Sequence, residues 1–159
     1  MAIGEIGGNP KRNLTVNFSI ERVKEAFKLS HYYLTDIKED RSKYDDVLNI
    51  YSFHFSENLS FGARIVILLK SISDDKTEID FEVQREFGSF DSDVEVNYAN
   101  QQLNNLCEIL SKILSMDAVD LEKLKTGQMT ISDSEKKSAK GSVGCFFIVL
   151  LIIIIDIVI

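Results

Sequence analysis

The chain has 159 residues, of which 45% are hydrophobic and 27% charged, and its 25 acidic residues outnumber its 18 lysines and arginines for a net charge of −7. This length is enough for one small domain with a modest core. Because no dense run of lysine and arginine is available to neutralise phosphates, the composition argues against a nucleic-acid-binding protein.

The chain is expected to begin with a polar arm, followed by a strand and a helix. Residues 1–12 contain the single proline and are typical of a loosely held arm. Residues 14–18 (LTVNF) alternate between apolar and polar, as a half-buried strand does. Ser19 is well placed to cap a helix over residues 20–30, where apolar side chains recur at helical spacing.

Residues 32–87 change to a period of two, which predicts a run of four antiparallel strands. The first is a weaker strand at about 32–40, and the last is 77–87, joined to its predecessor by a hairpin turn at 74–76 (DDK). The last strand has an apolar face that includes Arg85 and an acidic face that carries Glu78, Asp80, Glu82 and Glu86. The residues expected to share one face of the two middle strands are Val47, Asn49, Tyr51, Phe53 and Phe55, then Ala63, Ile65, Ile67 and Leu69.

The period then returns to that of a helix. A continuous apolar stripe predicts the longest helix, at about 93–115, with Asp91, Ser92 and Asp93 as capping candidates. A short helix capped by Asp117 is expected next, and the polar residues 128–142 are typical of a flexible tether.

The predicted fold class is α+β, a two-layer antiparallel β-sheet in the order β-α-β-β-β-β-α with both helices on its apolar face. By this order of elements, over about residues 13–115, the chain resembles helix-grip and TATA-binding-protein-like half domains. The resemblance implies a fold and no function. We expect an arm at 1–12, a globular domain at 13–116, a short helix and tether at 117–142, and a membrane anchor at 143–159.

The anchor is predicted from residues 143–159 (VGCFFIVLLIIIIDIVI), an apolar run that a small soluble domain has no evident way to bury. As a helix the run spans roughly 25 Å, against about 30 Å for the hydrocarbon core of a bilayer. The lysines before it favour a single-pass, tail-anchored topology with the N-terminal domain in the cytoplasm. The anchor comprises Phe146, Phe147, Ile148, Val149, Leu150, Leu151, Ile152, Ile153, Ile154 and Ile155, and the flanking lysines are Lys136, Lys137 and Lys140.

The tail leaves some alternatives open. Asp156 lies close enough to the chain end to reach the far interface, but in a longer membrane protein it would lie deep in the bilayer. The β-branched residues also suit a buried strand or a core helix. Cys145 is a candidate for acylation beside the membrane, whereas Cys107 is typical of a small apolar helix residue.

Residues with catalytic or metal-binding chemistry are sparse. His31 and His54 have no Cys, Asp or second His at a metal-binding spacing, and Asp91, Asp93 and Glu95 are typical of a helix start rather than of an EF-hand loop. No Gly-rich phosphate loop, nucleophile elbow or C-x-x-C motif is present. The sequence therefore predicts a non-enzymatic protein without cofactor or metal.

The first functional hypothesis is a tail-anchored binding module for a protein partner near the membrane, with the acidic row of residues 78–86 as a docking candidate for a basic partner. The alternative is a carrier or sensor of a lipid or other apolar small molecule held between the sheet and the long helix. A third is a membrane-active protein whose tail is itself the effector. The candidate cavity residues are Phe53, Phe55, Phe61, Phe81 and Phe87, which equally suit an ordinary core.

Overall fold

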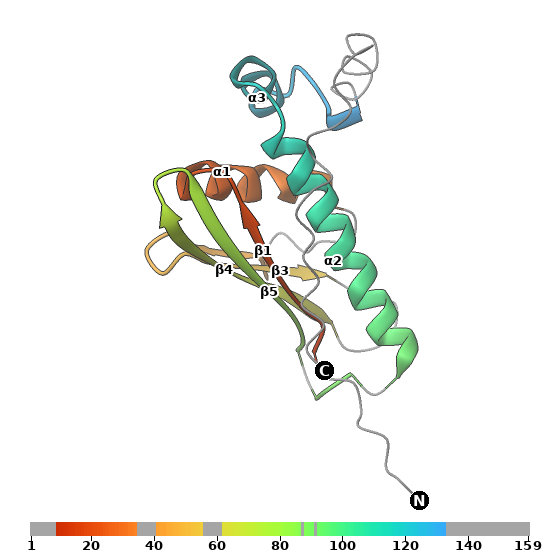
Figure 1. Ribbon diagram of the computed structural model, residues 1–159. Coiled ribbons are helices and arrows are strands. Elements are labelled where there is room, and N and C mark those ends of the chain that lie inside the picture. Colours follow the sequence, from red (N-terminus) through yellow and green to blue (C-terminus); the bar gives the residue numbers. More distant parts are fainter. Residues whose placement is uncertain (1–8, 35–40, 56–61, 87, 91, 133–159) are drawn as a thin grey trace, which may run out of the picture. The chain divides into compact units, whose positions relative to one another are not determined.

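The computed structural model describes residues 9–34, 41–55, 62–86, 88–90 and 92–132 (Figure 1). The chain forms two compact units, residues 1–115 and 116–159. The described elements of the first unit are β1 (Lys11–Val16), α1 (Ile20–Ser30), a 3-10 helix η1 (His31–Tyr33), β2 (Lys43–Asp45), β3 (Ile50–Phe55), β4 (Ala63–Ser73), β5 (Lys76–Arg85) and α2 (Asp93–Leu114).

The five strands form one sheet in the order β1-β5-β4-β3-β2, and every neighbouring pair is antiparallel. A two-residue turn joins β4 to β5, as the hairpin signal in the sequence predicts. The N-terminal strand lies beside β5, where the amide of Val83 also donates to the carbonyl of Pro10 (2.9 Å). The α+β class and the antiparallel sheet are therefore confirmed.

The two helices of this unit lie on one side of the sheet (Figure 1). The Ser19 side chain caps α1 by accepting from the amide of Arg22, and Ser92 caps α2 by accepting from the amide of Glu95. The Arg22 guanidinium also donates to the carbonyl of Ile113 (3.0 Å), which ties the start of α1 to the end of α2.

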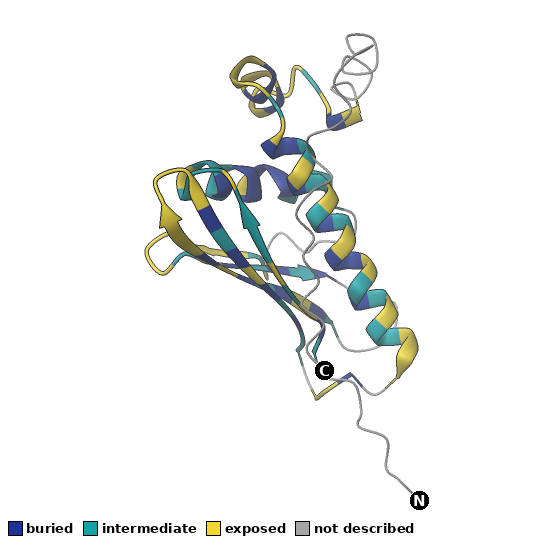
Figure 2. Ribbon diagram, in the orientation of Figure 1, coloured by how far each residue is buried: buried dark blue, intermediate teal, exposed yellow. Residues whose placement is uncertain are grey.

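The side of the sheet that faces α1 and α2, here called the inner face, carries the core (Figure 2). Strand alternation directs apolar side chains of β3, β4 and β5 to this face, and the helices cover them with their own apolar stripes. The side chains that are fully or almost fully buried include Val23, Phe27, Tyr51, Phe53, Ile65, Ile67, Ile79, Phe81, Leu103, Leu106 and Ile113.

The strands differ from the expectation in two places. Of the weaker strand predicted at 32–40 the structure describes only 32–34, where η1 occupies 31–33, and the first described strand of the run is β2. Val47 and Asn49 belong to a turn and not to β3. The cause is local hydrogen bonding, because Asp45 caps the amides of the turn and Asn49 adopts the left-handed conformation (φ 56°) that asparagine tolerates.

In the second unit, α3 (Ala118–Lys125) begins after Asp117, whose side chain accepts from the amide of Asp120 as predicted. Gly127 follows with a positive φ of 69°, which suits a residue just beyond a helix end. Among the described residues, no helix is long and apolar enough to cross a bilayer. The predicted anchor, its flanking lysines and Cys145 all lie outside the described residues.

Candidate functional site

The side of the sheet opposite the helices, here called the open face, carries the acidic row predicted from the sequence. The strand registers place side chains of β3, β4, β5 and β1 in two rows across this face. One row is Ile50, Leu68, Asp80 and Asn13, and the next is Ser52, Val66, Glu82 and Lys11. Apolar groups on β3 and β4 therefore lie beside carboxylates on β5.

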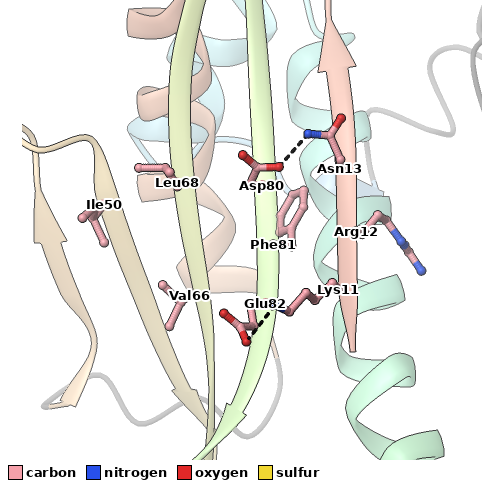
Figure 3. Close-up of a pocket in the computed structure, with 9 residues that line it drawn as sticks. All are labelled: Lys11, Arg12, Asn13, Ile50, Val66, Leu68, Asp80, Phe81 and Glu82. Carbon is pink, nitrogen blue, oxygen red and sulfur yellow. Dashed lines mark hydrogen bonds and ion pairs between the residues drawn. The ribbon is translucent and has the colours of Figure 1, made fainter. Parts of the chain in front are cut away.

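A pocket of about 550 Å³ opens over these two rows (Figure 3). Its apolar lining is made by Ile50, Val66, Leu68 and Phe81, and its polar lining by Lys11, Arg12, Asn13, Asp80 and Glu82. Leu68 is 43% exposed and Ile50 37%, and the two are neighbours on adjacent strands, which leaves a continuous apolar surface within reach of a ligand.

The charges of the acidic row are compensated unevenly. Glu78 accepts from Asn13 (2.9 Å) and lies 3.5 Å from the Lys70 ammonium, and both contacts lower its pKa. Asp80 accepts from the same Asn13 amide at 2.6 Å but has no ion pair among the described residues. Asp80 thus lies beside Leu68 with no cation of the described residues paired to it.

The third member of the row, Glu82, has more hydrogen-bond and ion-pair partners than Asp80. Hydrogen bonds from Asn9 (3.0 Å) and Gln84 (3.0 Å), together with the Lys11 ammonium at 3.5 Å, lower its pKa. Because hydrogen bonds and a nearby cation already satisfy Glu82, the carboxylate with most capacity for a further cation is Asp80.

A second polar cluster lies at the far end of the same face. Glu86 contacts Nδ1 of His54 at 2.8 Å and the guanidinium of Arg41 at 3.3 Å, and the hydrogen bond to His54 and the charge of Arg41 lower the pKa of Glu86. His54 therefore has a local hydrogen-bond partner in Glu86. Among the described residues, no group of His, Cys, Asp or Glu side chains could hold a metal ion.

The predicted cavity residues of the inner face lie in the core. Phe53 and Phe81 surround Phe27, with ring centroids 6.4 and 6.1 Å from its ring, and Phe55 lies 6.0 Å from Tyr98. These three rings pack against the helices as core side chains. Phe61 and Phe87 are outside the described residues.

The inner face also contains an ion pair that sequence reasoning did not connect. Arg85 contacts Glu95 of α2 at 3.0 Å, with 7% and 12% of the two side chains exposed, and Arg85 also donates to the carbonyl of Ser89 (2.9 Å). An arginine on an apolar strand face needs a carboxylate partner, which is the signal that could have identified this pair. Glu95 had been attributed to the helix dipole alone.

Cys107, the cysteine within the described part of the chain, is half-buried on α2. Burial raises the pKa of its thiol, while the nearby Arg12 lowers it to a smaller extent. A thiol with a raised pKa is a poor nucleophile at neutral pH, consistent with the packing role expected from the sequence.

No protein-family model matches the chain, and no curated protein resembles it. Solved structures with a similar arrangement include a protein from Chromobacterium violaceum, with 10% identity and a TM-score of 0.49 over 70% of this chain and 100% of that one. A START superfamily protein from Mycobacterium smegmatis has 13% identity and a TM-score of 0.41 over 65% and 94% of the two chains. The di-domain ARO/CYC BexL from the BE-7585A biosynthetic pathway has 7% identity and a TM-score of 0.47, and the match spans 68% of this chain and 48% of BexL. These similarities transfer no ligand and no activity.

Proposed function

We propose that this chain is a non-enzymatic binding module, tethered to a membrane by its C-terminal tail, that binds a basic, amphipathic segment of a partner protein on the open face. The observation that supports this function is the pocket in which Asp80, without an ion pair among the described residues, lies beside Leu68 and Val66. An apolar surface beside a carboxylate that has no ion pair of its own suits a segment that alternates aliphatic and cationic side chains.

Lysine and arginine are the side chains best matched to this geometry. Their aliphatic stems can cover Leu68 and Val66 while the charged head reaches the carboxylate of Asp80. The chain's net charge of −7 adds a longer-range attraction for a cationic partner.

The membrane half of the proposal rests on the tail sequence. Residues 143–159 carry one charge, Asp156, and the lysines at 136, 137 and 140 precede them, which favours a cytoplasmic N-terminal domain. A tether of this kind confines the domain near the bilayer and raises its effective concentration for partners at the same surface.

Replacing Asp80 with asparagine is expected to weaken binding of a basic segment about tenfold, the loss expected for one partly desolvated charge pair. The measurement is titration of the full chain, in zwitterionic lipid nanodiscs, with a short peptide of alternating lysine and leucine, with empty nanodiscs as the background. The wild-type affinity should also fall as salt is added.

Asp74→Asn is the matched control, because it removes the same charge from the exposed β4–β5 turn, outside the pocket lining. It should leave the affinity within about twofold of the wild type. Equal losses in the two variants would show that net charge alone, and not the pocket, attracts the peptide. Equal affinity in wild type and Asp80→Asn would remove Asp80 from the proposal.

The tail is tested by fractionation. The full chain should stay in the membrane pellet after washes with high salt and alkaline carbonate, whereas a version ending at Lys140 should be recovered folded in the supernatant. A full chain that washes off, or a shortened chain that unfolds, would mean that the apolar tail is packed within the protein.

A second candidate function is binding of an apolar small molecule. The volume of about 550 Å³ favours it, since ligand pockets commonly measure about 300–1,000 Å³. A competition experiment separates the two candidates. An uncharged amphiphile is added to the complex of the chain with the peptide, and its affinity is also measured for Asp80→Asn. If it displaces the peptide and binds the variant as tightly as the wild type, the small-molecule function is favoured.

A further inference from the structure

The turn between β2 and β3, residues 46–49, presents two apolar side chains to solvent. Val47 is 90% exposed and Leu48 61% exposed. Turns are usually built from glycine, proline, asparagine, aspartate and serine, because those residues satisfy the special backbone geometry or cap it. Asp45, Asp46 and Asn49 provide that chemistry here, so the turn itself does not require Val47 and Leu48 to be apolar.

The backbone amides of Val47 and Leu48 are already hydrogen-bonded within the protein. One carboxylate oxygen of Asp45 accepts from the amides of Val47 (3.0 Å) and Leu48 (2.8 Å), and the carbonyl of Asn49 accepts from the amide of Leu69 (3.0 Å). Because a peptide group taken out of water needs such partners, the tip can enter an apolar phase without leaving these amides unsatisfied.

The acidic side chain at the tip is also occupied. Asp46 accepts from the Lys28 ammonium (2.7 Å) and from the Tyr51 hydroxyl (2.6 Å), and its carbonyl accepts from Lys24 (3.3 Å). These bonds connect the turn to α1 and to the core residue Tyr51. The Lys28 ammonium balances the charge of Asp46, which lowers the cost of bringing this acidic turn to an apolar phase.

From this arrangement we infer that Val47 and Leu48 form a membrane-contacting tip that inserts into the interfacial region of a lipid bilayer. The inference rests on the proposed membrane attachment, because the chain beyond residue 132 ends in the apolar run 143–159. Two aliphatic side chains give weak binding by themselves. If the domain is already tethered to the bilayer, its contact with the lipid is effectively intramolecular. A weak contact is then enough to hold the domain against the membrane surface.

The chain contains no tryptophan, so Leu48→Trp places a single tryptophan at the tip, and its emission can be excited selectively over that of the tyrosines. The full-length variant is reconstituted into phosphatidylcholine vesicles with or without phosphatidylcholine brominated on its acyl chains. The matched control is Val94→Trp, which replaces another exposed apolar residue (66% exposed), in the first turn of α2. Emission from the tip should shift to shorter wavelength, and bromolipid should quench it at least about twice as strongly as it quenches the control.

The outcomes are distinct. Suppose the vesicles retain the protein after a carbonate wash, but the tip tryptophan matches the control in emission wavelength and quenching. That result would overturn the inference and leave the tail anchor intact. A shift to shorter wavelength without quenching would mean that protein, not lipid, covers the tip, and would also overturn it. If the protein washes off the vesicles, the anchor and this inference fall together.

Discussion

Replacing Arg85 with alanine is expected to lower the free energy of unfolding by about 3–5 kcal/mol, the usual loss when one partner of a buried ion pair is removed. Arg85 and Glu95 lie 3.0 Å apart with little solvent exposure, and they join the end of β5 to the first turn of α2. The variant would leave the largely buried Glu95 carboxylate without this cation. The measurement is urea unfolding of the full chain in a non-ionic detergent, followed by circular dichroism.

The double variant Arg85→Met with Glu95→Leu is the control, because apolar replacement of both partners leaves no buried charge behind. It should recover most of the lost stability. If Arg85→Ala alone costs less than about 1 kcal/mol, the pair behaves as an exposed one and water must reach it.

Replacing Phe27 with alanine is expected to cost about 3–5 kcal/mol, as the loss of a large buried aromatic side chain usually does. Phe27 is fully buried on α1, and its ring lies 5.9 Å from that of Tyr51 on β3 and 6.1 Å from that of Phe81 on β5. Removing it opens a cavity where the helix meets the inner face. The same unfolding measurement should show a lower midpoint in urea with little change in slope.

Tyr32→Ala is the matched control, since this aromatic side chain is 72% exposed and its loss should change stability by no more than about 0.5 kcal/mol. A small cost for Phe27→Ala would show that the inner face can repack. Such a face could also open for an apolar ligand, so that result would revive the carrier hypothesis for Phe53 and Phe81.

Local signals in the sequence accounted for the elements whose pattern repeats over many residues. Alternation in 77–85 identified both the buried face of β5 and its acidic face, because successive side chains of any strand point to opposite sides. The stripe on α2 and the capping side chains Ser19 and Asp117 were identified for the same reason: their signals lie within a few residues of each other along the chain.

Where a short segment admitted two structures, the local pattern failed. Val47 and Asn49 continue the alternation of β3, yet Asp45 caps the amides that follow it and turns the chain. The alternation of apolar and polar residues does not show that the Asp45 carboxylate, and not a neighbouring strand, will accept hydrogen bonds from the amides of Val47 and Leu48.

Local patterns along the chain were enough to establish the α+β class, the apolar and acidic faces of β5, the capped helices and the apolar character of residues 143–159. The folded arrangement was needed to show that Leu68 lies beside Asp80, that Arg85 contacts Glu95, and that Val47 and Leu48 project from a hydrogen-bonded turn. The reason is that periodicity and capping depend on neighbours along the chain. Strand order, register and helix docking depend instead on which distant segments bury their apolar faces together, and that sets which charges and apolar groups share a surface.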